Sequence, residues 1–122
     1  MNESSNAKTM YEAVPAVAEL NKVPDFDPLK FLRRTKDTLK LDLPYQKLWF
    51  RMAHPNGRMR VTAMRITDQM AIFEAKVFMD RSDAEPFSMS VVQQTKQDNK
   101  DFVKAAQNEA LSQALSDAGF GI

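Results

Sequence analysis

The sequence predicts an α+β fold, in which an antiparallel four-stranded β-meander has an N-terminal helix before it and a long C-terminal helix packed on it. An Asn-Gly turn signal lies between two alternating segments, two further alternating segments follow, and the chain closes with an alanine-rich helical pattern that stops at a glycine. With 122 residues the chain has the length of one domain. We predict a flexible N-terminal tail over residues 1–24 and a single α+β domain over residues 25–122.

The first predicted helix follows the tail. Residues 1–24 are polar and lack a strong period, apart from a short helical pattern near residues 11–20. Asp27 followed by Pro28 combines an N-cap residue with a proline at the first helical position. These two residues predict a helix near residues 28–38.

The strongest local signal is a β-hairpin around Asn56-Gly57, the preferred pair for a two-residue turn. It joins residues 45–53 to residues 59–66, and a type I′ turn would set Trp49 opposite Met64 and Arg51 opposite Thr62. One face of this hairpin would be mainly apolar, with Leu48, Phe50, Met52, Val61 and Ala63. The other face would carry Tyr45, Lys47, Trp49, Arg51, Arg60 and Thr62.

Two more strands and a helix complete the predicted domain. Residues 70–79 alternate, with Glu74, Lys76 and Phe78 on the side opposite an apolar set, and a fourth strand is expected near residues 87–93. A helix is expected from about residue 100 to residue 118, after the capping pair Asp98-Asn99 and before Gly119. Its buried stripe would comprise Val103, Ala106, Ala110 and Ala114, with Phe102, Leu111 and Leu115 beside it.

Positive charge is concentrated in one part of a nearly neutral chain. Residues 30–65 hold ten basic side chains against two acidic ones, a net charge of +8, whereas the whole chain has a net charge of +1. Such segregation indicates a localised anionic partner. The only tryptophan and one of the two tyrosines lie in the same block. Interleaved cations and aromatic rings favour nucleic acid.

The candidate nucleic-acid-binding residues lie on the polar face of the predicted hairpin and on the strand beside it. Arginine and lysine bind phosphates, while an exposed indole ring stacks on unpaired bases. The six residues are Lys47, Trp49, Arg51, Arg58, Arg60 and Lys76. An alternative is that this face is covered by the first helix or by another subunit. The basic run from Lys30 to Lys40 is less specific, because a solvated helix face has the same pattern.

Several function classes are not supported by the sequence. The chain has no cysteine, and its single histidine, His54, has no partner at the spacing of a metal site or a catalytic pair. No phosphate-binding glycine loop or hydrolase motif occurs, so we expect no enzyme activity, cofactor, catalytic residue or small-molecule substrate. Without an apolar run of about 18 residues or a secretory signal, the sequence predicts a soluble cytoplasmic protein with no membrane partner.

The C-terminal helix carries a family resemblance. Residues 101–121, with the pattern Glu109-Ala110, Ala114-Leu115 and Gly119-Phe120-Gly121, resemble the corresponding helix of single-strand annealing proteins. This superfamily includes the phage Erf-like recombinases and the eukaryotic Rad-type recombination mediators, and the resemblance covers roughly residues 45–121. It implies a homo-oligomer that binds single-stranded DNA in a basic groove and anneals complementary strands in phage or mobile-element recombination, without ATP or metal. One departure is that relatives often carry Lys or Arg where this chain has Ser112, Gln113, Ser116 and Asp117.

Two other functions remain open from the residues. The helix–strands–helix order is similar to that of a double-stranded RNA-binding domain, and Lys96, Lys100 and Lys104 near the final helix loosely suit that function. The third possibility is a structural or oligomerisation protein that uses the basic block as a subunit interface, paired with the acidic residues 66–122 of a neighbour.

Overall fold

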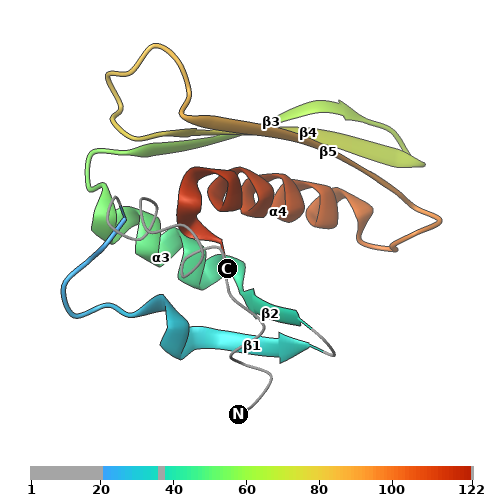
Figure 1. Cartoon of the computed structure of the whole chain (residues 1–122). Helices are drawn as coiled ribbons and strands as arrows, with labels where there is room; N and C mark the ends of the chain where they lie inside the picture. The colour runs from blue at the N-terminus through green and yellow to red at the C-terminus, as the bar shows by residue number, and fades with distance from the viewer. Residues whose placement is uncertain (1–20, 36–37, 122) are drawn as a thin grey trace.

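The computed structural model describes residues 21–35 and 38–121 of the chain, and these form an α+β fold in three layers. The first layer is a three-stranded sheet, the second is helix α4 (Phe102–Leu115), and the third contains helix α3 (Leu43–Ala53) and a small hairpin (Figure 1). The helix expected near residues 11–20 lies outside the described residues. Within the expected tail, the side chain of Asn21 is fully buried.

The sheet contains three of the four predicted strands. Strands β3 (Arg58–Ile66), β4 (Met70–Phe78) and β5 (Ser88–Thr95) are antiparallel and lie in the order β3-β4-β5. The alternation in β4 is as predicted, because Ala71, Phe73, Ala75 and Val77 are all buried on one face. Period-2 patterning therefore identified these three strands, and in β4 it also identified the inner face.

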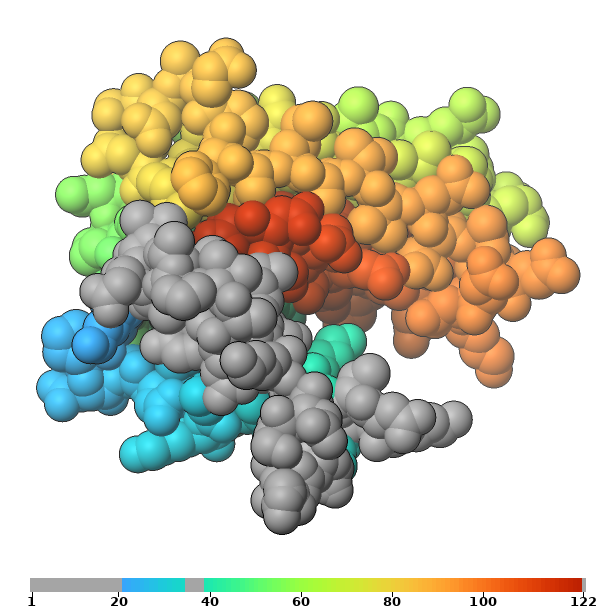
Figure 2. Space-filling view, in the orientation of Figure 1, coloured from blue at the N-terminus to red at the C-terminus, as the bar shows by residue number. Residues whose placement is uncertain are grey.

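Helix α4 covers the inner face of the sheet, as the alanine stripe predicted (Figure 1). Ala106, Ala110 and Ala114 are fully buried, and their small side chains let the helix lie close to β5. The Ser88 hydroxyl of that strand donates a 2.6 Å hydrogen bond to the carbonyl oxygen of Ala114. In the space-filling view, the visible part of α4 lies in a recess below the sheet (Figure 2).

The chain leaves α4 through one wide helical turn, η3 (Ser116–Phe120). Gly119 has a φ of 98° there, a left-handed conformation that glycine adopts without a steric penalty. The predicted stop at this glycine is confirmed, and the turn directs Phe120 into the core, where it is fully buried.

The predicted hairpin around Asn56-Gly57 is wrong, because residues 43–53 form α3 rather than a strand. Asp42 occupies the N-cap position and Pro44 lies in the first turn, as is usual at a helix start. Gln46, Trp49, Phe50 and Ala53 follow the spacing i, i+3, i+4, i+7, which forms one helical face toward the core. The expected pairings of Arg51 with Thr62 and of Trp49 with Met64 therefore do not occur.

Asn56-Gly57 instead connects α3 to β3, and close packing explains the glycine. A Cβ atom at Gly57 would lie 2.5 Å from Cζ of Phe50, so any side chain there would displace a core ring. Gly57 is therefore needed because the junction between α3 and β3 packs closely against Phe50, and not because it forms a tight hairpin turn.

The helix expected at residues 28–38 is also wrong beyond its first turn. Asp27 does cap a single 3₁₀ turn, η2 (Pro28–Phe31), by accepting a hydrogen bond of 3.0 Å from the Leu29 backbone N–H. Strands β1 (Leu32–Thr35) and β2 (Thr38–Leu41) follow and pair antiparallel. Leu32 faces Leu41 across this hairpin, and Leu41 is buried in the core. The described residues thus contain five strands in two sheets, not one four-stranded meander.

Candidate nucleic-acid interface

Five of the six predicted binding residues lie on two adjoining surfaces. Lys47 and Arg51 are one turn apart on α3, and Arg58 begins β3, which follows α3 after a short connection. Arg60 lies two residues further along β3, and its cross-strand partner is Lys76 of β4. The sixth residue, Trp49, lies elsewhere.

The first surface, here called the basic groove, is a cavity of about 560 Å³ between the C-terminal half of α3 and the start of β3. Three cationic residues, Lys47, Arg51 and Arg58, contribute to its wall. The apolar lining comes from the facing elements and includes Phe50, Met59, Val61 and Leu111. The groove therefore combines positive charge with an apolar lining.

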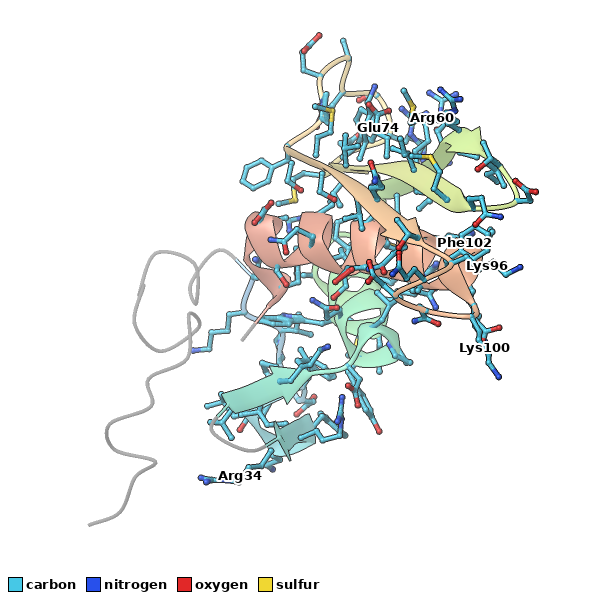
Figure 3. All side chains as sticks on the ribbon, turned by 90° about the vertical axis from the view of Figure 1, so that its right-hand side faces the viewer. Arg34, Arg60, Glu74, Lys96, Lys100 and Phe102 are labelled. Carbon is cyan, nitrogen blue, oxygen red and sulfur yellow. The ribbon has the colours of Figure 1, made fainter. Side chains whose placement is uncertain are left out.

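The second surface is the outer face of the sheet, on the side away from α4. Figure 3 labels Arg60 and Glu74 on this face. The guanidinium carbon of Arg58 lies 4.3 Å from the ring centroid of Phe78, a cation–π contact that covers this ring. Lys76 approaches Glu74, with 3.7 Å between its Nζ and the carboxylate oxygen. Alternation along β3 thus brings Arg58 and Arg60 to the same face.

Most cations of these two surfaces lack an acidic partner. The described residues form two ion pairs, Arg33 with Asp42 and Lys76 with Glu74. The side chains of Lys47, Arg51, Arg58 and Arg60 therefore have no ion pair within the described part of the chain. Cations left unneutralised beside one another favour an anionic ligand.

Trp49 is not a stacking platform, contrary to the prediction. Its side chain is fully buried, and its Nε1–H donates a 2.7 Å hydrogen bond to the backbone carbonyl oxygen of Asn21. The indole packs edge-on against Phe120, with 5.1 Å between ring centroids. The helical conformation of residues 43–53 explains the error, because it turns Trp49 and Phe50 to the same side of the chain, whereas a strand would separate them.

The structure adds exposed apolar residues that the prediction missed. Phe87, Met89 and Val91 have exposed fractions of 54%, 51% and 57%. Met89 and Val91 face Lys76 and Glu74 across the sheet and so lie on its outer face, and Phe87 directly precedes β5. The alternation of side chains in residues 87–93 could have identified them, because every second residue of a strand lies on the face opposite the core. Arg65, which faces Ile72 after a β-bulge in β3, adds a further exposed cation on the same side of the sheet.

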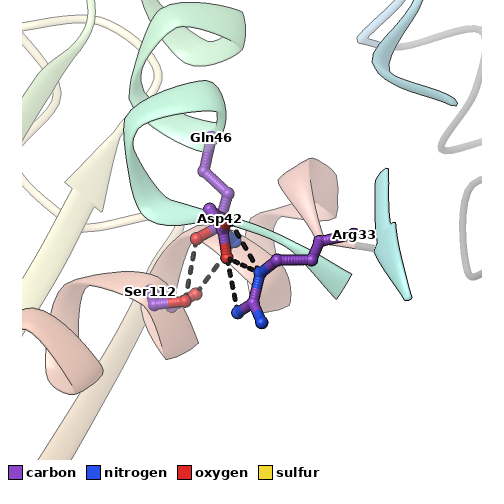
Figure 4. A network of polar contacts seen from close by, with 4 residues as sticks. All are labelled: Arg33, Asp42, Gln46 and Ser112. Carbon is purple, nitrogen blue, oxygen red and sulfur yellow. Dashed lines mark hydrogen bonds and ion pairs between the residues drawn. The ribbon is translucent and has the colours of Figure 1, made fainter. Parts of the chain in front are cut away.

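The basic run from Lys30 to Lys40 lies apart from this interface. Arg34 and Arg60 are at opposite ends of the molecule (Figure 3). Arg33 forms a two-pronged hydrogen bond with Asp42, as shown in Figure 4. The hydrogen bonds from Arg33 hold the pKa of Asp42 below its ordinary value. This part of the basic block therefore anchors the β1–β2 hairpin to the start of α3.

His54 lines the basic groove, and its ring also contacts residues of the core. Its Nε2 lies 3.2 Å from Oδ1 of Asn21, and its ring packs edge-on against Phe120. Burial lowers its pKa, because removal from water disfavours the charged imidazolium. Within residues 21–35 and 38–121, no three His, Cys, Asp or Glu side chains converge as a metal site.

Comparisons with family models, curated proteins and solved structures found no match for this chain. None of the described helices has the length and apolar character to cross a membrane. The case for a function therefore rests on the basic groove and the outer sheet face.

Proposed function

We propose that this chain binds single-stranded DNA through the basic groove and the adjoining outer face of the sheet. The observation that carries the proposal is the gathering of Lys47, Arg51, Arg58 and Arg60 on two continuous surfaces, with no acidic partner in the described part of the chain. Lys47 and Arg51 belong to α3 and Arg58 belongs to β3, and all three line the same groove.

Two features favour a single strand over a duplex as the ligand. The apolar lining of the groove offers surface to unstacked bases, which a duplex keeps covered. The exposed Phe87 adds an aromatic ring directly before β5. In this proposal the cations contact phosphates, and the apolar lining of the basic groove and Phe87 contact bases.

The test is fluorescence anisotropy of a labelled poly-dT oligonucleotide, titrated at several salt concentrations. A double variant, Lys47→Ala with Arg51→Ala, removes two groove cations from the surface of α3. Because each lost phosphate contact lowers the slope of log affinity against log salt by about 0.7 for single strands, the slope is expected to fall by about 1.4.

The matched control is Lys100→Ala with Lys104→Ala, which makes the same change of net charge near the start of α4. Affinity and salt slope are expected to stay near the parent values in this control. Equal losses in both double variants would mean that net charge, rather than the groove, drives binding, and would contradict the proposed site.

Strand annealing in phage or mobile-element recombination, by an oligomer of this chain, is the further activity that the resemblance of residues 101–121 adds to DNA binding. A fluorophore-labelled strand and a quencher-labelled complement report annealing directly. The protein is expected to accelerate quenching without ATP or metal. DNA binding without acceleration would limit the function to strand binding.

A structural or oligomerisation function is the second candidate, favoured by the exposed Phe87, Met89 and Val91 at the β5 edge of the sheet, the edge opposite the basic strand β3. Light scattering across salt concentrations separates the two functions. Disassembly of the protein alone at high salt, with no DNA binding at low salt, would favour a subunit interface.

Double-stranded RNA is a further alternative ligand, supported by the order α3-β3-β4-β5-α4. Competition between labelled poly-dT and an unlabelled RNA duplex tests it. On the single-strand proposal, unlabelled poly-dT displaces the probe at far lower concentration than the duplex does.

A further inference from the structure

A second cavity lies on the other side of α4 from the basic groove. Its volume is about 550 Å³, within the usual range for small-molecule sites. One wall comes from the end of β2 and the start of α3, the other from α4, and Gln94 and Asn99 lie at the β5 end. This cavity, here called the amide pocket, has thirteen lining residues, among them Gln46, Gln94, Asn99, Asn108, Ser112 and Gln113.

The chemistry of the lining is unusual. Ten of its thirteen residues are polar, and five of these are Asn or Gln, whereas ligand pockets are lined mainly by apolar and aromatic groups. No aromatic residue lines it, so it offers no ring for a base to stack on. One lysine and two carboxylates give no excess of positive charge for an anion.

Part of this polar lining is held by internal hydrogen bonds. The Gln46 side chain is buried, and its Nε2 donates to the carbonyl oxygen of Phe120 at 3.1 Å while its Oε1 accepts from the Ser112 hydroxyl at 2.8 Å. Figure 4 shows Gln46 and Ser112 beside Asp42, which binds Arg33. This network fixes the wall where α3 meets α4.

Other polar groups of the pocket remain available to a ligand. Gln94 donates to Glu109, and Gln113 donates to Asp117, so each amide uses its N–H while its carbonyl oxygen has no partner among the described residues. Asn108 has no side-chain hydrogen bond within the same part of the chain. Its amide therefore presents one donor group and one acceptor to the pocket.

We propose that the amide pocket binds a neutral saccharide. Each sugar hydroxyl donates one hydrogen bond and accepts others, and carboxamides and carboxylates supply both kinds of partner. The absence of an aromatic ring and of excess positive charge disfavours a nucleotide. This site is separate from the proposed DNA interface, since none of its residues lines the basic groove.

The test is a titration of ¹⁵N-labelled full-length protein with N-acetyl-D-glucosamine and D-glucose, observed by NMR. Side-chain NH₂ signals report directly on Asn108, Asn99, Gln94 and Gln113. We expect at least one sugar to shift these signals in a saturable manner. Absence of a saturable shift with both sugars would overturn the proposal.

The decisive variant is Asn108→Ala, with Gln107→Ala as the matched control one residue away. Both residues are exposed on α4, and alanine favours the helix, so both variants retain the fold. Loss of about one net hydrogen bond in Asn108→Ala is expected to raise the sugar Kd about fivefold. An unchanged Kd in Asn108→Ala, or an equal rise in Gln107→Ala, would contradict the site.

A third arm separates this site from DNA binding. Thymidine monophosphate is titrated under the same conditions, and the sugar titration is repeated with the Lys47→Ala and Arg51→Ala double variant. An unaltered sugar Kd in that variant supports a separate site. Saturable shifts of the Asn108 and Gln113 signals by the nucleotide, and not by the sugars, would assign the pocket to nucleotides and overturn the saccharide proposal.

Discussion

Trp49 and Asn21 are joined across 28 residues of sequence by a hydrogen bond of 2.7 Å from the indole Nε1–H to the backbone carbonyl oxygen. Asn21 is itself fully buried, and its side-chain amide donates to the carbonyl oxygen of Ala118. One asparagine thus ties the beginning of the described chain to α3 and to the turn after α4. The tryptophan is therefore a structural residue.

The first prediction concerns Trp49. Trp49→Ala is expected to lower the free energy of unfolding by about 3–5 kcal/mol, because it removes a large buried ring and leaves a cavity. Trp49→Phe keeps most of the volume but leaves the Asn21 oxygen without its donor, at a cost of about 1–3 kcal/mol. Urea unfolding followed by circular dichroism measures both. Stability equal to the parent in Trp49→Ala would be incompatible with a buried indole.

The second prediction separates stability from DNA binding on the outer sheet face. Arg60 and Lys76 face each other across β3 and β4, and like charges in this arrangement repel. Arg60→Glu replaces repulsion with attraction, so we expect the free energy of unfolding to rise by about 0.2–1 kcal/mol. Affinity for poly-dT is expected to fall in the same variant.

Urea unfolding and fluorescence anisotropy measure the two effects of Arg60→Glu. Lys96→Glu is the control, with an equal change of charge at an exposed position outside the proposed interface. Unchanged affinity in a folded Arg60→Glu variant would remove the outer sheet face from the proposed interface.

The third prediction is a pH dependence that originates at His54. Burial lowers the pKa of His54 in the folded protein, so below about pH 6.5 the unfolded chain binds more protons than the folded one. Stability from this residue is therefore complete at higher pH and declines as the pH falls from about 6.5 toward the lower folded-state pKa.

Urea unfolding at several pH values, compared with His54→Gln, isolates this contribution. Glutamine keeps a hydrogen-bond donor toward Asn21 but does not titrate, so the variant is expected to lose less stability between pH 7.5 and pH 5.5, both values chosen about one unit from the reference histidine pKa. Parallel pH profiles for the two proteins would show that His54 is not the source.

The fourth prediction tests the turn after α4. Gly119 has a φ of 98°, and an L-residue with a side chain pays about 1–2 kcal/mol in a left-handed conformation. Gly119→Ala is therefore expected to lower the free energy of unfolding by about that amount. Asp117→Ala, in the same turn but exposed, is the control and is expected to change stability little. Equal stability of Gly119→Ala and the parent would contradict the observed backbone conformation.

The sequence was most informative where one face of an element is buried over its whole length. Strand β4 alternates cleanly because α4 covers only one side of it, and α4 repeats its alanines because it lies against that sheet. The same reasoning failed for α3. Residues 45–53 contain both an alternating pattern and the helical spacing of Gln46, Trp49, Phe50 and Ala53, and only packing of the helical face against Phe120 distinguishes them.

For the candidate site, too, the sequence predicted some features, and others depended on packing. The sequence predicted Lys47, Arg51, Arg58, Arg60 and Lys76 as members of one binding surface. In the structure these cations lie on two adjoining surfaces, which a helix–strand junction brings together instead of the expected hairpin. The burial of Trp49 follows from that difference, since the helix turns its side chain into the core.

The α+β class, the inner face of β4 and the alanine stripe of α4 could all be predicted from the sequence, because each depends on a periodicity within one element. Gly119, in the turn after α4, could be predicted as a helix stop because glycine favours a left-handed φ. The helical state of residues 43–53, the pairing of β1 with β2, the burial of Trp49, the basic groove and the amide pocket became evident only from the folded structure. Those features depend on contacts between residues far apart in the chain, whose free energies outweigh local preferences.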